Sequence, residues 1–158
     1  MGFVPKDFDK TNDEFWEYIT KRLQTLWHRI TWVFTDNEEM QNSSLKGYEV
    51  HLVHGLVKEG AQLRSIKDSP LFAESQAWFE MMQTSPTQVI MELYEETLKE
   101  INRHAVEIIE QSLRDGELGV LFVDSSVNLP FPEEMRVIRM FPFNPNDYLY
   151  RYQVRQSK

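Results

Sequence analysis

Three aspartates, Asp36, Asp68 and Asp124, follow stretches that are expected to be parallel β-strands. Because the carboxyl ends of parallel strands meet at one edge of a sheet, ligands of open α/β sheets bind there. Three carboxylates at such an edge supply the oxygen ligands that Mg²⁺ prefers. The pattern predicts a magnesium site that could assist a hydrolysis. Further polar groups are available beside two of the aspartates: Glu38, Glu39, Ser125 and Ser126.

The same aspartates also have a structural interpretation. Aspartate is common after strands and before helices, because its side chain accepts hydrogen bonds from nearby backbone N–H groups. We favour this interpretation for Asp36, Asp68 and Asp124 over the metal site. In the favoured case the protein has no cofactor, and Mg²⁺ belongs to the alternative only.

Other candidate groups are weaker. Glu96, Glu100 and His104 are four residues apart on an expected helix and share a stripe, which is more typical of a solvated ion-pair face than of a metal site. His51 and His54 are three apart, but zinc needs three or four converging ligands. No Gly-x-Ser-x-Gly elbow accompanies the serines after Asp124, and no glycine-rich phosphate loop is present.

The elements that would position these groups centre on the stretch from Ser85 to Ser126. Apolar residues recur there at three- and four-residue steps, which predicts one long helix over about 86–115. Ser85 is the expected N-cap and Pro86 fits the first turn. Gly116 is expected to stop the helix, and the apolar run 119–123 predicts a strand that is buried on both sides.

The rest of the chain predicts further alternation of helix and strand. Helices are expected from residue 11 or 12 to 27, near 48–57, and after Asp68 or Ser69. Strands are expected near 30–35, 61–66 and 136–140, in addition to 119–123. Two alternatives stay open, since residues 28–35 could continue the first helix and residues 48–52 could be extended. The predicted fold is a single α/β domain over 11–158, with an N-terminal arm at 1–10 and a mostly parallel sheet of about four strands flanked by four helices.

Composition restricts the function classes. The chain has 158 residues with 25 acidic and 17 basic side chains, so the formal charge of −8 argues against nucleic acid and anionic lipid as partners. No window approaches the roughly twenty apolar residues of a membrane span. Without cysteine there are no disulfides, thiolate metal sites or cysteine nucleophiles. No secretory signal is evident, so we expect a cytoplasmic protein.

Several framework stretches resemble an uncharacterised bacterial and archaeal family that is distantly similar to the TraB-like pheromone-shutdown proteins. They are Val57-Lys-Glu-Gly-Ala-Gln-Leu63, Asp68-Ser-Pro-Leu-Phe72, Leu113-Arg-Asp-Gly-Glu-Leu-Gly-Val-Leu-Phe-Val123, and Leu129-Pro130 before Arg136-Val-Ile138. The resemblance covers about the last two thirds of the chain. Where that family has a histidine after the strand this chain has Val127, and Ile101 and Asn102 replace an arginine–acid pair. The resemblance therefore implies a framework without the family's polar site residues.

The aromatic residues are the remaining feature. Four tryptophans, six tyrosines and ten phenylalanines are many for a core of this size. Aromatic residues are enriched at the centres of protein interfaces, which indicates a homo-oligomer, most simply a homodimer through the C-terminal tail or the first helix. Tyrosines covering the core edge are an equal alternative. We therefore expect a domain that acts through protein association without catalysis; the alternative is the Mg²⁺-assisted hydrolase.

Overall fold

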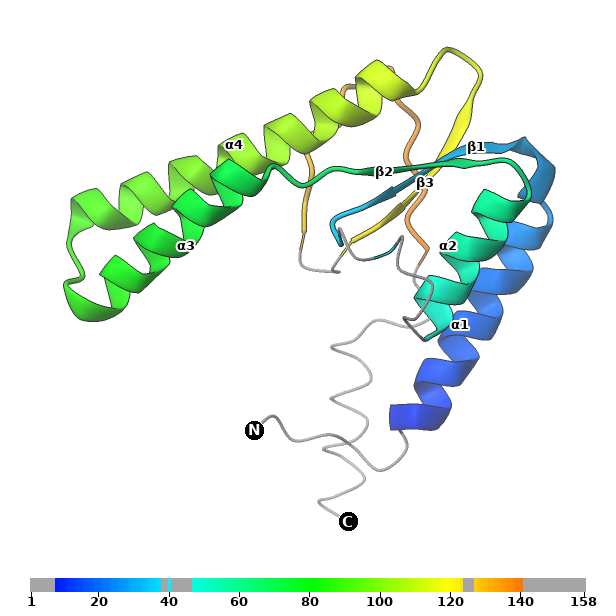
Figure 1. Cartoon of the computed structure of the whole chain (residues 1–158), viewed down its shortest axis with the longest axis horizontal. Helices are drawn as coiled ribbons and strands as arrows, with labels where there is room; N and C mark the ends of the chain where they lie inside the picture. The colour runs from blue at the N-terminus through cyan, green and yellow to red at the C-terminus, as the bar shows by residue number, and fades with distance from the viewer. Residues whose placement is uncertain (1–7, 38–39, 41–46, 124–126, 141–158) are drawn as a thin grey trace. The chain divides into compact units, whose positions relative to one another are not determined.

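The computed structural model describes residues 8–37, 40, 47–123 and 127–140 (Figure 1). The contacts of the chain divide it into two units, and each is described here by itself. One unit is residues 28–135, and the other contains residues 1–27 and 136–158. The predicted arm at residues 1–10 is wrong at residues 8–10, which are helical, and residues 1–7 lie outside the described residues.

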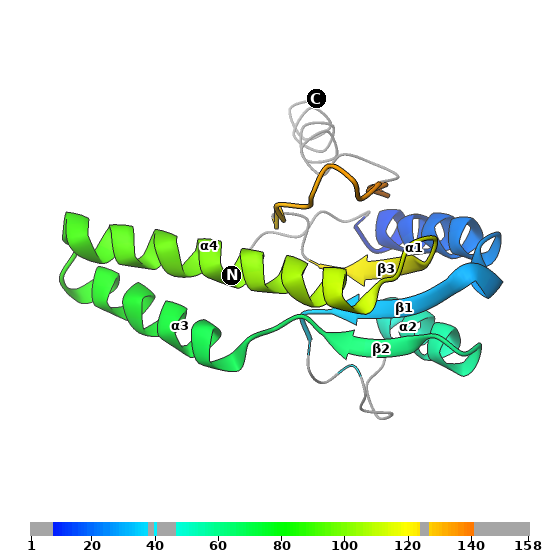
Figure 2. The same cartoon turned by 90° about the horizontal axis from the view of Figure 1, so that it is seen from above.

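The sheet belongs to the unit 28–135 and has three parallel strands. They are β1 (Ile30–Thr35), β2 (Gln62–Ser65) and β3 (Leu118–Phe122), in the order β2-β1-β3 (Figure 2). β1 is the central strand, and Val33 lies opposite Leu63 on one side and Val120 on the other. The predicted parallel α/β fold is confirmed, and residues 30–35 are a strand.

The predicted fourth strand at 136–140 is wrong, because these residues have no regular structure. Their apolar side chains are not buried as those of a central strand are, and Ile138 is 63% exposed. A β-branched stretch becomes a strand only where a neighbouring edge can accept its backbone hydrogen bonds.

Four α-helices are described: α1 (Phe8–Gln24), α2 (Tyr48–Lys58), α3 (Ser69–Thr84) and α4 (Gln88–Ser112), with a short 3₁₀ turn at Trp27–Arg29. In α1 the side chains of Ile19 and Leu23 are buried. α2 confirms the helical alternative for residues 48–57. Gly60 follows it with φ of 110°, a conformation that favours glycine at a helix end.

The long helix begins later than predicted. Thr87, not Ser85, is its N-cap, and Thr87 Oγ1 accepts a hydrogen bond from Ile90 N at 3.3 Å. Ser85 instead ends α3, where its backbone N–H donates to the carbonyl oxygen of Met81 at 2.8 Å. Pro86 therefore lies in the connection between the two helices.

α4 packs on one face of the sheet and α2 on the other (Figures 1 and 2). The crossover from β1 to β2 and the crossover from β2 to β3 run in opposite directions across the sheet, so two right-handed crossovers place their helices on opposite faces. Phe34 is 1% exposed and belongs to the core on the α4 side, which also contains Ala105 and Ile109. A Cβ added at Gly119 would lie 3.1 Å from Phe34 Cε2, so glycine lets β3 approach this ring. Leu129, from the irregular segment after β3, is buried in the same core.

α3 and α4 lie side by side in opposite directions and form a helical hairpin between β2 and β3 (Figure 1). Only the C-terminal half of α4 lies over the sheet. The N-terminal half of α4 and its partner α3 extend beyond the sheet, where no other described element of the unit 28–135 lies alongside them (Figures 1 and 2). We call this pair the α3–α4 hairpin.

Candidate functional sites

The carboxyl edge of the sheet holds two of the three predicted metal ligands within the described residues. Asp36 directly follows β1, and Asp68 lies between β2 and α3. The remaining groups, Asp124, Ser125, Ser126, Glu38 and Glu39, lie outside the described residues. Among the described residues, no group of three acidic or histidine side chains could hold a metal ion. The magnesium site stays a prediction.

Asp68 has a structural role that its position explains. Its Oδ1 accepts a hydrogen bond from Leu71 N at 2.9 Å, which satisfies one free N–H of the first turn of α3. Its Oδ2 lies 3.4 Å from Nε2 of His104 on α4. Asp68 therefore caps the N-terminus of α3 and, through His104, also contacts α4.

Asp68→Ala should lower the free energy of unfolding by about 1 kcal/mol, the usual cost of removing an N-cap side chain. Asp68→Asn should lose less, because the amide oxygen can still accept the hydrogen bond from Leu71 N. Urea unfolding of both variants measures the difference. A rise in melting temperature with Mg²⁺ that both substitutions abolish would instead assign Asp68 to a metal site.

Asp36 lies near another carboxylate, Glu49, in the first turn of α2. Partial burial raises the pKa of the Glu49 carboxyl, and the charge of Asp36 raises this pKa further. The folded protein therefore holds a proton on Glu49 more tightly than the unfolded chain does. The negative charge of Asp36 thus opposes the ionisation of Glu49.

Glu49→Gln should raise the free energy of unfolding at neutral pH, by on the order of a few tenths of a kcal/mol for this partly solvated pair. A glutamate whose pKa is raised by folding costs stability once the pH exceeds that pKa, and the cost disappears below the ordinary glutamate pKa of about 4.3. The gain should therefore vanish as the pH falls to about 4. Urea titrations at both pH values test this, and a gain of equal size at both would contradict the ionisation argument.

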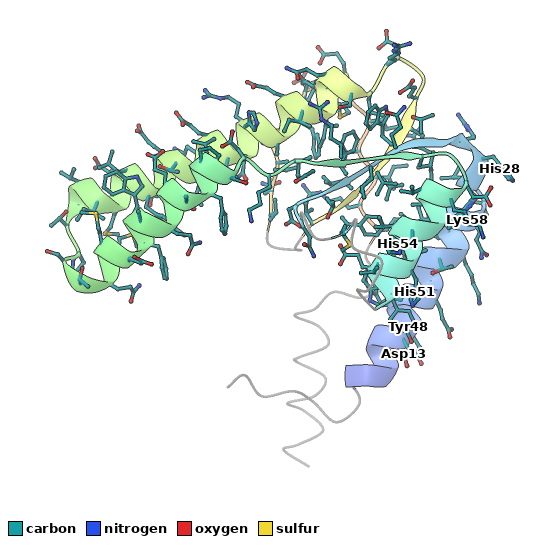
Figure 3. The ribbon with its side chains drawn as sticks, viewed as in Figure 1. Asp13, His28, Tyr48, His51, His54 and Lys58 are labelled. Carbon is teal, nitrogen blue, oxygen red and sulfur yellow. The ribbon has the colours of Figure 1, made fainter. Side chains whose placement is uncertain are left out.

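The two histidines of α2 do not share one environment. Figure 3 shows His51, His54 and Lys58 projecting from this helix. His51 is exposed, whereas His54 is half-buried and its Nε2 lies 2.9 Å from the carbonyl oxygen of Met40. This contact gives His54 a local structural partner.

A pocket of about 460 Å³ lies near the amino ends of the strands, at the edge opposite the predicted site. Side chains from β1, β2, the end of α4 and the turn before β3 line it: Trp32, Gln62, Arg64, Gln111, Ser112, Arg114 and Glu117. These residues are not among the sites predicted from the sequence. Alternation in the predicted strand 61–66 could have placed Gln62 and Arg64 on one face, but no local pattern joins them to the end of α4.

The α3–α4 hairpin exposes large apolar side chains. Several are about two-fifths exposed: Phe72, Phe79, Met81, Met91 and Leu98. In contrast, the buried residues of α3 and of α4 before Ala105 are only Ser75 and Thr97. The outer part of the hairpin therefore has little apolar core of its own.

No family model matches this chain, and comparison with curated proteins and with solved structures likewise gave no match. Among the described helices, none is long and apolar enough to cross a membrane.

Proposed function

We propose that this protein is an association domain that forms a homodimer through its α3–α4 hairpin. The observation that carries the proposal is one apolar stripe of α4 that is buried over the sheet and exposed beyond it. The stripe consists of Met91, Tyr94, Leu98, Ile101, Ala105, Ile108 and Ser112, and we call it the α4 seam.

The α4 seam has alternating steps of three and four residues, the spacing of a helix that packs along its length against other helices. Its C-terminal part is covered, since Ala105 is 3% and Ile108 9% exposed. Its N-terminal part is not, since Leu98 is 38% and Met91 43% exposed. The same pattern thus continues for about three turns beyond the sheet, where α3 is the only described element beside it and Met91 and Leu98 stay exposed.

α3 contributes to the same exposed surface. The ring centroids of Phe79 and Tyr94 are 6.0 Å apart, which joins α3 to the seam. Phe72 lies seven residues before Phe79, two helical turns away, and so shares its face of α3. Phe72 and Phe79 are each about two-fifths exposed, and contiguous exposed apolar side chains can mark an interaction site.

A second copy of this chain is the occupant that fits this exposed surface. No seam position carries a charge, whereas residues 69–112 contain eight glutamates and only two basic residues, all outside the seam. An uncharged apolar seam bordered by acidic side chains suits an identical seam, because the hydrophobic core forms while the glutamates stay in solvent. Two antiparallel hairpins related by a two-fold axis would form a four-helix bundle.

The sequence analysis placed the interface at the C-terminal tail or the first helix. Residues 141–158, which include that tail, lie outside the described residues. The proposal keeps the predicted homodimer and places it on α3 and α4 instead.

Sedimentation velocity over about a hundredfold range of protein concentration tests the proposal, combined with thermal melts at the same concentrations. We expect dimers at the upper concentrations and a melting temperature that rises with concentration, because association stabilises the folded state. A monomer with a constant melting temperature throughout the range would rule out the homodimer.

A further inference from the structure

We propose that the pocket beside Arg64 binds a small polar organic carboxylate. The pocket lies near the amino ends of the strands, away from the outer part of the hairpin, so this proposal is independent of the dimer. Its volume of about 460 Å³ is within the range of small-molecule sites, roughly 300–1,000 Å³.

Arg64 is held in a defined position. The half-buried guanidinium donates from Nη1 to Ser112 Oγ at 2.6 Å, and Ser112 Oγ donates to the carbonyl oxygen of Ile108 at 2.7 Å. Ser112 is itself buried. This chain of hydrogen bonds fixes the end of Arg64 against the last turn of α4.

The fixed guanidinium has donors to spare. Arginine has five N–H donors, and within the described part of the chain Arg64 uses them only for Ser112 and has no carboxylate partner. A partly desolvated cation without a neighbouring anion raises the free energy of the folded protein. A ligand carboxylate that accepts two parallel hydrogen bonds from the Arg64 guanidinium would supply that anion.

The other lining residues favour an anion that is polar throughout. Arg114 adds a second positive charge, and Gln62 and Gln111 add amide groups that can donate to oxygen. The opposing carboxylate, Glu117, already accepts through Oε2 from Arg114 N and from Thr31 Oγ1, each at 3.3 Å. In a chain of net charge −8, this pocket has an excess of positive charge.

Trp32 provides the one aromatic wall. Its ring stacks on Phe34 with centroids 5.8 Å apart and an interplanar angle of 10°. Because Phe34 is buried, this stacking holds the indole in place beside the pocket. The combination of a fixed guanidinium, amides and one flat wall suits a compact organic acid better than a large apolar ligand.

Citrate and succinate are the probes, titrated at constant ionic strength, with sulfate as the inorganic anion. We expect at least one of the two carboxylates to raise the melting temperature saturably and to shift the Trp32 indole N–H signal in ¹H–¹⁵N spectra. Arg64→Gln should weaken this binding roughly tenfold or more, as expected for a lost charged hydrogen bond. Arg103→Gln is the matched control, because Arg103 lies on the exposed side of α4 near Glu100, and should leave binding unchanged.

Three outcomes would overturn the proposal. They are no saturable response to either carboxylate, an equal response in Arg64→Gln, and a response to sulfate as strong as that to the carboxylates. If Arg64→Gln does not fold, the pair Gln62→Ala and Arg114→Gln replaces it, since both side chains are exposed and line the same pocket. Unchanged binding in both of these variants would also overturn the proposal.

Discussion

Leu98→Glu should convert the dimer into monomers at concentrations at which the unmodified protein is dimeric. Leu98 lies in the middle of the exposed part of the α4 seam and is 38% exposed. In the dimer a glutamate here would be buried without a cation, and an unpaired buried charge is far more costly than lost apolar contact. We expect the dissociation constant to rise about a hundredfold or more, which corresponds to roughly 2.8 kcal/mol.

Val89→Glu is the matched control for this substitution. Val89 is also an exposed apolar residue of α4, at 64%, but it precedes Leu98 by nine residues. Nine residues are two and a half helical turns, so Val89 lies on the opposite side of α4 from the seam. Sedimentation equilibrium of both variants measures the two dissociation constants. Equal effects would show that added negative charge, and not the seam, controls association.

Phe34→Ala should lower the free energy of unfolding by about 3–5 kcal/mol, the range for truncating a buried phenylalanine. Phe34 is in the central strand, is 1% exposed, and contacts the core residues of α4. A cavity at this position could not close easily, because β1 is held by strands on both sides. The loss is a large part of the stability of an ordinary domain.

Phe34→Leu is the graded comparison and should cost less than about 1.5 kcal/mol, since it keeps most of the apolar volume. Urea unfolding at one fixed protein concentration measures both variants, because a dimer's stability changes with concentration. A Phe34→Ala loss no greater than that of Phe34→Leu would mean that the ring does not fill the core on the α4 side.

The sequence predicted the elements whose signals are local. The predicted strands at 30–35, 61–66 and 119–123 differ from β1, β2 and β3 by one residue or less at each end. Asp68 was one of two caps considered for α3, and the structure shows it in that role. Residues 28–35 had two alternatives, a continued first helix or a strand. Residues 30–35 form the strand because they pair with a neighbouring strand on each side.

The parts that the sequence could not predict depend on distant partners. The strand expected at 136–140 has suitable residues but no paired neighbour. Arg64 becomes a candidate ligand-binding residue only through Ser112, which is 48 positions away. An apolar face on the long helix was predicted, but the exposure of its N-terminal part depends on where the sheet ends beneath α4, which no local pattern records.

The position of the hairpin between β2 and β3 also affects how the chain can fold during synthesis. β1 and β2 can pair as soon as residue 65 is available, but β3 ends only at Phe122. At about 5–20 residues per second, synthesis of the intervening chain takes several seconds. During this time one edge of β1 has unpaired backbone groups, the feature that promotes aggregation through strand pairing. The hairpin, which is synthesised before β3, thus determines how long a nascent chain must be protected from pairing with neighbouring chains.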